Sequence, residues 1–392
     1  MSILILLFWV FIALLFYTYL GYPPLLIFWN KLKPNQISEH PVSNVLPKID
    51  LVIAAYNEER VIREKIENSM QLDYPKELIN IWIVSDGSSD RTNDIVKEFT
   101  KSEKNVHLLE FPRTGKSGVI NKAMAIIKGD IIVFSDANTE YEPMAIKRLI
   151  YHFSNNEVGC VCGRLIYRNP NTVISGEGES LYWRFETALK MLESKIGYIA
   201  GANGAIYAIR QSLFKPLPSN TINDDFTISM NIVLKGYKSL YEANAIAYED
   251  VAPDMESEFR RHVRDGAGHY IAIGHLLGLL NPFLGIRSLI YWSHRILRWS
   301  APFILIVVFF INLFLVSSYM YLALLLLQIL FYGLAILGLA SVKLRTKMPF
   351  FMYIPFYFCN LNAALFFGFL KAITGNQKTT WQSTTRLDLD IT

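Results

Sequence analysis

The fold is indicated most directly by residues 81–90, whose sequence IWIVSDGSSD joins an apolar run to an acidic turn. The pattern returns at residues 131–138, IIVFSDAN, where a second apolar run ends in acid and amide side chains. Short apolar runs bounded by polar turns are typical of buried strands, and an open α/β sheet binds its ligands outside the carboxyl ends of such strands. Carboxylates gathered at that edge suit a divalent cation and a nucleotide better than they suit a core.

The residues around these two runs alternate between strand-like and helical patterns. Strands are expected over 49–55, 81–85, 106–110 and 131–135, and helices over 58–70, 92–100 and 117–128. Asp90 or Thr92 can cap the second of these helices. Strands that alternate with helices of this length predict βαβ units and a mostly parallel sheet. We therefore expect one α/β domain over residues 49–268.

Uncharged apolar segments flank this domain. Residues 1–30 carry no charge and exceed the ~20 residues that a membrane-spanning helix needs. A retained N-terminal transmembrane helix is the favoured interpretation, because a cleaved signal peptide normally has a positive start and a shorter apolar stretch. Residues 299–342 are again uncharged, with a turn expected at 317–319, and 348–370 form a third uncharged run. Residues 301–371 therefore predict two or three further transmembrane helices.

The basic residues beside these segments indicate an orientation. They are Lys31 and Lys33, then Arg295 and Arg298, then Lys343, Arg345 and Lys347. Basic residues next to membrane spans favour the cytoplasmic side. This predicts a multi-pass protein of the plasma (inner) membrane with a cytoplasmic catalytic domain, a linker over 31–48 and a tail over 372–392. Between domain and spans, residues 269–300 mix aromatic and basic side chains, which predicts amphipathic helices in the membrane interface, with core-facing helices as the alternative.

Composition excludes other partners and sites. The net charge of +4 is too small to indicate a nucleic-acid partner, and basic flanks that face anionic lipid account for it. The three cysteines, Cys160, Cys162 and Cys359, form neither a disulfide framework nor a metal-ligand spacing. The mean hydropathy of +0.26 agrees with a membrane protein.

Five motifs, taken in order, resemble those of a known family. They are AAYNEE at 54–59, DGSSD at 86–90, GK at 115–116 with Asn121, DAN at 136–138 and DD at 224–225. Together they resemble the family-2 glycosyltransferases, the inverting enzymes that use nucleotide-sugars and include hyaluronan, cellulose and poly-N-acetylglucosamine synthases. The resemblance implies a nucleotide-sugar-binding domain of GT-A type, flanked here by transmembrane helices as in the polysaccharide synthases.

The resemblance assigns nucleotide-binding roles to five residues, which are Tyr56, Glu58, Asp86, Lys116 and Arg264. Tyr56 and Glu58 would hold the base, and Asp86 would accept a hydrogen bond from the uracil imide. Lys116 starts a helix, where a cation is unfavourable unless an anion lies there too, so it would contact phosphate. Arg264 would bind the diphosphate. The alternatives are ordinary ones: a solvated helix start, a turn and a solvated basic helix.

The resemblance also implies a metal site and a catalytic base. Asp136 and Asn138 match an Asp-x-Asp motif and would hold Mg²⁺ or Mn²⁺, with an amide oxygen in place of the second carboxylate. Asp224 and Asp225 match the acidic pair that supplies the base. Asp225 would take the proton of the acceptor hydroxyl, and one in-line displacement would invert the sugar. A helix cap at 224–225 is compatible with that role.

Four residues are candidates for the acceptor side, which are Gly201, Asn203, Arg261 and Trp381. Gly201 and Asn203 lie in a small, flexible segment that looks like the family's acceptor loop, although tight packing explains it equally. Arg261 stands where many synthases have the glutamine of a Gln-x-x-Arg-Trp motif, and Asp265 replaces its tryptophan. Trp381 loosely resembles part of a gating element, with a disordered tail as the alternative.

These assignments predict a membrane-bound enzyme that transfers a sugar from a UDP-sugar to a glycan or lipid-linked acceptor in cell-surface polysaccharide synthesis. Asp265 in place of tryptophan favours single additions over a processive polysaccharide synthase coupled to export, which remains the first alternative. A catalytically silent protein that binds nucleotide-sugar and regulates a partner is the second. Asn138 is its one support, and Asp225 speaks against it because a binding module needs no base.

Overall fold

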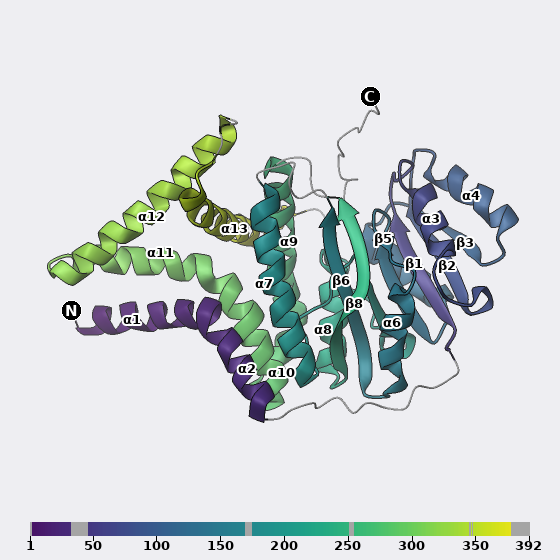
Figure 1. The fold of residues 1–392 in the computed structure, drawn as a ribbon, viewed down its shortest axis with the longest axis horizontal. Helices are drawn as coiled ribbons and strands as arrows, with labels where there is room; N and C mark the ends of the chain where they lie inside the picture. The colour runs from purple at the N-terminus through teal and green to yellow at the C-terminus, as the bar shows by residue number, and fades with distance from the viewer. Residues whose placement is uncertain are drawn as a thin grey trace.

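The computed structural model describes residues 2–32, 46–168, 175–250, 255–344, 346 and 348–377. The molecule is elongated, with an α/β domain at one end and a group of long apolar helices at the other (Figure 1). Helices α7 (Ser175–Ile196) and α9 (Met255–His275) stand between these two parts (Figure 1). Residues of both the α/β domain and the apolar helices can therefore contribute to a site at this junction.

The α/β domain is built on one sheet, which has eight strands within the described residues, in the order β3-β2-β1-β4-β7-β6-β8-β5. The strands are β1 (Ile49–Ala55), β2 (Ile79–Asp86), β3 (Val106–Phe111), β4 (Ile131–Asp136), β5 (Glu140–Tyr141), β6 (Val158–Arg168), β7 (Tyr207–Arg210) and β8 (Lys238–Asp250). Strands β3, β2, β1 and β4 are parallel to one another, whereas β7 is antiparallel to both β4 and β6. Strand β8 is parallel to β6 and antiparallel to β5. The sheet is therefore mixed, and its parallel half is the one that the sequence predicts.

Helices cover both faces of this sheet. They are α3 (Ile62–Met70), α4 (Thr92–Ser102), α5 (Lys116–Ile126), α6 (Ala145–Tyr151) and α8 (Asp224–Leu234), with 3-10 turns at Lys76–Leu78, His152–Ser154 and Gln211–Leu213. Because side chains alternate along a strand, Leu51 and Ile53 of β1 pack with α3, α4 and α6, while Val52 packs on the other face with α5 and α8. All seven residues of β1 are buried, which explains why its sequence is apolar except at Asp50.

The observed elements lie close to the predicted ones in the parallel half. Strand β1 has the predicted bounds, and β2, β3 and β4 extend the predicted runs by one to three residues. Helix α3 is shorter than predicted, because residues 58–61 form a turn before it begins at Ile62. Asp90 lies just before α4 and its carboxylate accepts the backbone N–H of Thr92 at 3.0 Å, whereas the N-cap residue of the helix is Arg91. The carboxyl ends of β1, β2 and β4 therefore meet at one edge.

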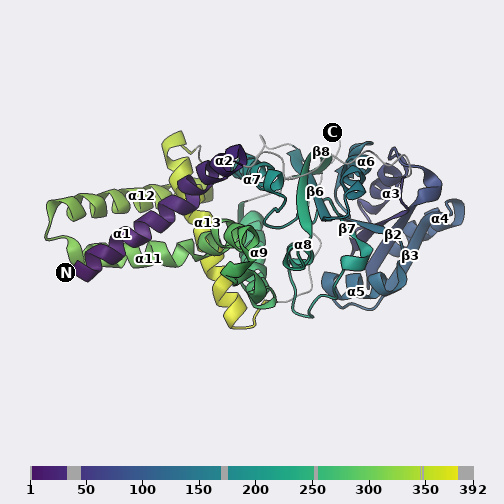
Figure 2. The same ribbon diagram turned by 90° about the horizontal axis from the view of Figure 1, so that it is seen from below.

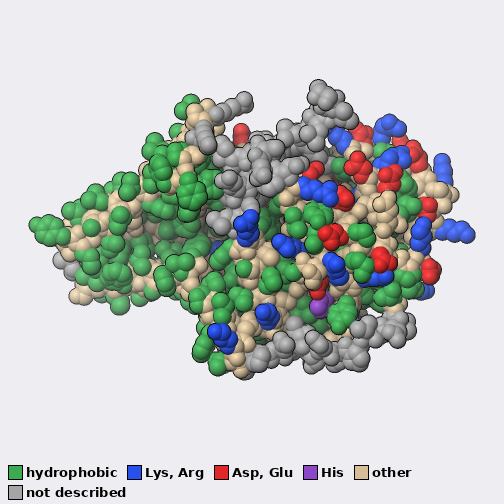
Figure 3. Space-filling model, in the orientation of Figure 1, with side chains coloured by type: hydrophobic (Ala, Val, Ile, Leu, Met, Phe, Trp, Pro, Cys, Tyr) green, Lys and Arg blue, Asp and Glu red, His purple; other side chains and the backbone are tan. Residues whose placement is uncertain are grey.

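Four helical stretches of the described chain are long and apolar enough to cross a membrane. They are Ser2–Leu32, made of α1 (Ser2–Phe16), η1 (Tyr17–Gly21) and α2 (Tyr22–Leu32); Ile286–Leu315, made of α10 (Ile286–Ile290), η8 (Tyr291–Ile296) and α11 (Leu297–Leu315); α12 (Tyr319–Lys343); and α13 (Phe350–Ile373). Apolar side chains cover the surface of this part, while charged side chains gather over the α/β domain (Figure 3). Phe314 is 74% exposed and Ile336 is 68% exposed, a surface that suits hydrocarbon better than water.

The direction of α13 differs from that of the other apolar helices. Helices α1, α11 and α12 extend away from the α/β domain, whereas α13 runs across them, beside α9 (Figures 1 and 2). Two views agree on this arrangement. Composition alone therefore does not decide whether α13 crosses a membrane or lies in its plane.

The interpretation of residues 269–300 as interfacial helices stays a prediction, and for three of the basic residues the structure favours the core-facing alternative. This range contains the end of α9, 3-10 turns at Leu277–Leu280 and Pro282–Leu284, and the start of the second apolar stretch. Its basic side chains His294, Arg295 and Arg298 do not face lipid headgroups but are buried inside the protein. The reason is a set of carboxylate partners on α7, described below, which sequence spacing does not reveal.

Candidate active site

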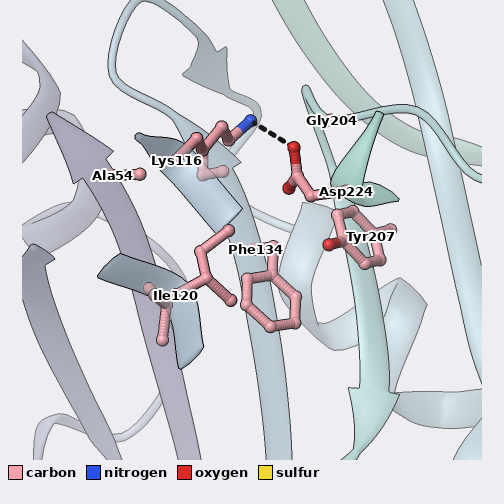
Figure 4. Close-up of a pocket in the computed structure, with 9 residues that line it drawn as sticks. Ala54, Lys116, Ile120, Phe134, Gly204, Tyr207 and Asp224 are labelled. Carbon is pink, nitrogen blue, oxygen red and sulfur yellow. Dashed lines mark ion pairs between the residues drawn. The ribbon is translucent and has the colours of Figure 1, made fainter. Parts of the chain in front are cut away.

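The candidate site begins at the edge where β1, β2 and β4 end. Tyr56 follows β1, Asp86 ends β2 and Asp136 ends β4. Helix α5 starts at Lys116 and helix α8 starts at Asp224, and the two side chains face each other across a small cavity (Figure 4). The structure thus brings together residues that five separate motifs contribute.

Asp86 is fully buried and organises the loop before α5. Its carboxylate accepts the backbone N–H of Thr114 at 2.6 Å and that of Gly115 at 3.0 Å, and pairs with the Arg113 guanidinium at 2.7 Å. Gly115 has a φ of +85°, which favours glycine and lets its N–H point at the carboxylate. The role predicted for Asp86 toward uracil stays a prediction, and the contacts observed are within the protein.

Arg113 is a site residue that the sequence reasoning missed. Its guanidinium carbon lies 3.1 Å from the centroid of the Tyr56 ring, so the two form a stacked cation–π pair. Tyr56 is the residue predicted to lie near the base. Two positions after it, Glu58 lines the main cavity described below. The available signal for Arg113 was its position just before the Gly-Lys motif.

The loops after β1 and β2 are held together by Asn57. Its φ of +53° lies in the left-handed region, and it is the non-glycine residue of the described chain found there. The side-chain oxygen accepts the backbone N–H of Ser89 at 2.8 Å. This bond ties the Tyr-Asn-Glu motif to the Asp-Gly-Ser-Ser-Asp motif, so the two loops contact each other.

Lys116 links two of the predicted functional carboxylates. Its Nζ lies 2.7 Å from Asp136 Oδ1 and 3.5 Å from Asp224 Oδ1. Burial alone would lower the pKa of Lys116, but the negative charges of Asp136 and Asp224 outweigh it, so the pKa is raised. Lys116 is therefore a permanent cation at the centre of the site.

Asp224 and Asp225 form a carboxylate pair at the N-terminus of α8. Asp224 is 4% exposed, and Asp225 Oδ1 accepts the backbone N–H of Phe226 at 2.7 Å. Burial, and then repulsion from Asp224, raise the pKa of Asp225 to about 7, while Lys116 opposes the shift. Burial also raises the pKa of Asp224, again against the attraction of Lys116. A carboxylate with a pKa near neutrality is suited to act as a general base.

The predicted metal ligands present a partial set of oxygen atoms. The Asp136 side chain is 35% exposed, and Asn138 donates its amide N–H to Glu249 Oε1 at 2.9 Å, which leaves the amide oxygen as the atom that can ligate. Within the described residues, no group of three or more His, Cys, Asp or Glu side chains has a metal-holding arrangement. Oxygen donors in this number fit an Mg²⁺ or Mn²⁺ ion that substrate phosphates also ligate.

Helix α9 contributes the basic residues. Arg264 lines the main cavity, and its Nε is buried without a hydrogen-bond partner among the described residues. A buried guanidinium N–H without a partner is costly and is expected to have an anionic ligand. Arg261 also lines the cavity, and its Nη1 lies 3.4 Å from the Tyr167 hydroxyl.

The segment before β7 packs against helix α8. Gly201 has a φ of +103°, and a Cβ at this position would lie 2.4 Å from the Phe226 ring, so close packing requires glycine here. Asn203 lines the cavity, donates to the Gly163 carbonyl at 3.2 Å and accepts the Ile206 N–H at 3.2 Å. Close packing at Gly201 and hydrogen bonds at Asn203 therefore hold this segment in place beside the cavity. Trp381, the fourth acceptor-side candidate, lies outside the described residues.

One cavity of about 870 Å³ contains most of the predicted site residues. Its polar end is lined by Lys116, Asp136, Asn138, Asp224 and Asp225. It continues past α7 and α9 to side chains of the N-terminal helix and of α13. The cavity therefore connects the α/β domain to the apolar helices, which the motifs did not predict.

A buried group of charges holds this junction. Glu186 of α7 pairs with His294 Nε2 at 3.0 Å, Arg295 at 2.9 Å and Arg298 at 2.9 Å. Glu193, about two turns further along α7, contacts His294 Nδ1 at 2.6 Å. Burial alone would raise the pKa of Glu186, but the positive charges of Arg295 and its neighbours outweigh it and hold the pKa well below its usual range.

The same charges position the wall at residues 199–203. Arg295 Nε donates to the Ala200 carbonyl at 2.6 Å, and Glu193 Oε2 accepts the Ala200 N–H at 3.0 Å. Tyr22 of α2 donates to Glu193 at 2.8 Å. Residues from two apolar stretches therefore fix the backbone beside the predicted base.

The fold is shared with a known class of transferase. A mannosyltransferase, PcManGT from Pyrobaculum calidifontis, solved in complex with GDP-Man and Mn²⁺, superposes with a TM-score of 0.68 over 94% of this chain and 99% of that chain. The two sequences are 19% identical, so the likeness concerns the fold. Sheet, flanking helices and strand-end site define a glycosyltransferase domain of GT-A type joined to apolar helices.

The sequence comparison matches one part of the chain to a family. Residues 50–214 match the model of glycosyl transferase family 2, and this part of the chain is a family-2 glycosyltransferase domain. Relatives include the probable glycosyltransferase YdaM of Bacillus subtilis (strain 168), 30% identical over 58% of this chain and 56% of that protein. A poly-beta-1,6-N-acetyl-D-glucosamine synthase of Staphylococcus epidermidis is 26% identical over 56% of this chain and 54% of its own length.

A third relative is named as a lipid-modifying enzyme. The beta-monoglucosyldiacylglycerol synthase of Trichormus variabilis (strain ATCC 29413 / PCC 7937) is 26% identical over 48% of this chain and 42% of its own length. The chain thus spans about half the length of the curated relatives it matches. Their names cover both polysaccharide and glycolipid synthesis.

Proposed function

We propose that this protein is a membrane-bound inverting glycosyltransferase that transfers a sugar from a UDP-sugar to a glycan or lipid-linked acceptor in cell-surface polysaccharide synthesis. One observation carries the proposal: Asp225, with a pKa of about 7, lines the same cavity as the Lys116–Asp136 ion pair. A base, a cation and a carboxylate for a metal thus share one space. A site that only bound nucleotide-sugar would have no use for the base.

The proposed step is a single displacement. The acceptor oxygen attacks the anomeric carbon of the sugar while Asp225 takes the hydroxyl proton. The new carbon–oxygen bond forms as the bond to the diphosphate breaks, and the nucleoside diphosphate leaves with that electron pair. Attack opposite the leaving group inverts the anomeric configuration. General-base catalysis of this kind contributes about 10²–10⁴-fold.

The remaining residues bind the donor in this proposal. The stacked Tyr56–Arg113 pair, set in place by Asp86, would contact the uracil base. Lys116 and the unpartnered Nε of Arg264 would contact the diphosphate. Mg²⁺ or Mn²⁺, when bound by Asp136 and Asn138, would neutralise charge on the leaving diphosphate. The superposed mannosyltransferase was solved with Mn²⁺, and this supports metal dependence.

The proposed topology places the α/β domain in the cytoplasm, at the plasma (inner) membrane. Lys31 at the end of the first apolar stretch and Lys343 at the end of α12 support this side. Three spans, made by α1–α2, α10–α11 and α12, would place both Lys31 and Lys343 on the cytoplasmic side. Helix α13, which runs across the others, would then lie in the cytoplasmic interface (Figure 2).

A donor panel tests the function. Purified protein in detergent with Mg²⁺ or Mn²⁺ would be given UDP- and GDP-sugars one at a time, and release of nucleoside diphosphate would be measured. We expect turnover with one UDP-sugar and its loss in Asp225→Asn. Binding of a UDP-sugar without turnover in the presence of membrane lipids would favour the silent regulator instead. Turnover with GDP-sugars alone would refute the assignment of uracil as the bound nucleobase.

A further inference from the structure

The main cavity joins two chemically different regions. At one end lie Asp136 and Asp225. At the other end the wall is mainly aliphatic and aromatic, with Leu20 from the N-terminal apolar stretch and Ile354 and Leu361 from α13, and its polar atoms are tyrosine hydroxyls and the amide of Asn362. Because the cavity is continuous, a single molecule can contact both ends. An occupant matched to this wall must be polar at one end and apolar at the other.

The helices that form the apolar end are irregular at the cavity. Tyr19 and Leu20 lie in the π-helical segment η1, which interrupts the first apolar stretch. Arg295 lies in the second π-helical segment, η8. Helix α13 carries Pro355 between two of its lining residues. Short π-helical segments within helices occur frequently at functional sites, and here two of them face the same cavity.

From this geometry we propose, on the basis of the function proposed above, that the acceptor is a membrane lipid whose head carries a hydroxyl group. Its head reaches Asp225 through the cavity, and its hydrocarbon lies between η1 and α13. The lipid hydroxyl loses its proton to Asp225, its oxygen bonds to the anomeric carbon, and the nucleoside diphosphate departs with the electrons of the broken bond. The product is a glycolipid that remains in the bilayer.

Two physical arguments favour this occupant. A glycan chain in the apolar end would place many of its hydroxyl groups against Leu20, Ile354 and Leu361, where they would lose hydrogen bonds to water, and the few tyrosine hydroxyls and the Asn362 amide of this wall would replace only some of them. A lipid phosphate is already an anionic nucleophile and needs no base, whereas an alcohol requires the carboxylate that the cavity contains. The apolar end therefore selects a lipid, and the polar end selects an alcohol.

The test uses the full chain in phosphatidylcholine nanodiscs with the UDP-sugar that it turns over. Four acceptors are compared: dioleoylglycerol, its β-glucoside, dioleoyl phosphatidic acid and a water-soluble tetrasaccharide. Leu361→Trp narrows the apolar end of the cavity, and Leu337→Trp is the matched control, because Leu337 lies on α12 and is 54% exposed. Binding of UDP reports that the donor site of each variant is folded.

We expect transfer to one of the two lipid alcohols. Leu361→Trp should raise the KM for that lipid by about tenfold or more, because overpacking a filled wall excludes the chain, while Leu337→Trp should not change it. Transfer to phosphatidic acid, or elongation of the tetrasaccharide at equal rates with and without the bilayer, would overturn the inference but leave the glycosyltransferase intact. Failure of every UDP-sugar to bind would overturn the proposed function and this inference together.

Discussion

Replacing Asp225 with asparagine should separate activity from stability. The substitution keeps the shape of the side chain and removes its ability to accept a proton. We expect the transfer rate at pH 8 to fall by about 10²–10⁴-fold, the usual contribution of a general base. In the unsubstituted protein the rate should rise with pH through about 7, because Asp225 acts only when deprotonated. At pH 6 only about a tenth of the molecules would carry the active form.

The same substitution should make the folded protein more stable at high pH. Folding raises the pKa of Asp225 from 3.8 to about 7, so the folded state favours the protonated form. The favourable contribution of this group is complete below pH 3.8 and is lost as the pH rises through 7. At about 1.4 kcal/mol per pH unit the difference approaches about 4 kcal/mol, and solvent in the cavity reduces it to about 2–4 kcal/mol. Asparagine, which does not ionise, avoids this cost.

The assay combines nucleotide release with unfolding in detergent, both from pH 5 to pH 9. Asp94→Asn serves as the control, because Asp94 is an exposed carboxylate on α4. We expect Asp225→Asn to unfold at a higher denaturant concentration than the parent protein at pH 9, with a smaller difference at pH 5. Activity of Asp225→Asn within tenfold of the parent, or a parent rate that does not change between pH 6 and 8, would refute the reasoning.

Three further substitutions test other parts of the structure. Glu186→Ala leaves three buried basic side chains without their carboxylate and should cost about 3–5 kcal/mol of unfolding free energy, measured by denaturant unfolding in detergent. Glu98→Ala, which removes an exposed ion pair, is the control and should change the unfolding midpoint far less. Gly201→Ala places a Cβ 2.4 Å from the Phe226 ring and strains a backbone φ of +103°. It should therefore lower both the melting temperature and the transfer rate, and unchanged values of both would contradict the packing described. Lys116→Met removes a cation that lowers the pKa of Asp225, so the rise in rate should move to higher pH, and a shift to lower pH in the pH–rate profile would exclude this electrostatic role.

The parallel half of the sheet could be predicted from the sequence because its strands are short apolar runs with polar ends. Strand β1 is buried on both faces, and Asp50 is its one polar residue. The Asp50 carboxylate accepts the Gly129 N–H and the Trp82 indole N–H, so it is tolerated inside the sheet. The bounds of β1 therefore still coincide with the apolar run. The strands of the other half are harder to predict, since β6 and β8 carry exposed side chains toward their ends and β7 has only four residues. Antiparallel pairing of β7 depends on tertiary contacts rather than on local pattern.

The acidic residues of the site could largely be predicted from motifs, whereas the side chains that contact and support them could not. Asp86, Asp136 and Asp225 are found by motif, because each follows a recognisable strand or starts a helix. Arg113 was missed because its position just before the Gly-Lys motif is a weak signal until its stacking partner, Tyr56, is known. The pairing of Glu186 with His294 joins residues 108 positions apart, which no periodicity indicates.

The apolar end of the cavity could not be predicted for a different reason. A helix that crosses a bilayer and one that lies in its plane can share the same length and composition, so hydropathy identifies α13 without giving its direction. Its packing against α9 decides the direction, and with it which residues reach the catalytic cavity (Figure 2).

The charges at the junction also bear on how the protein is made. Because synthesis proceeds from the N-terminus, α7 emerges before residues 291–298, and Glu186 and Glu193 must wait for their basic partners. Arg295, which fixes the Ala200 backbone beside Asp225, arrives only with the second apolar stretch. The nascent α/β domain therefore cannot finish its own active site, which is completed only after the second apolar stretch and then α13 have been made.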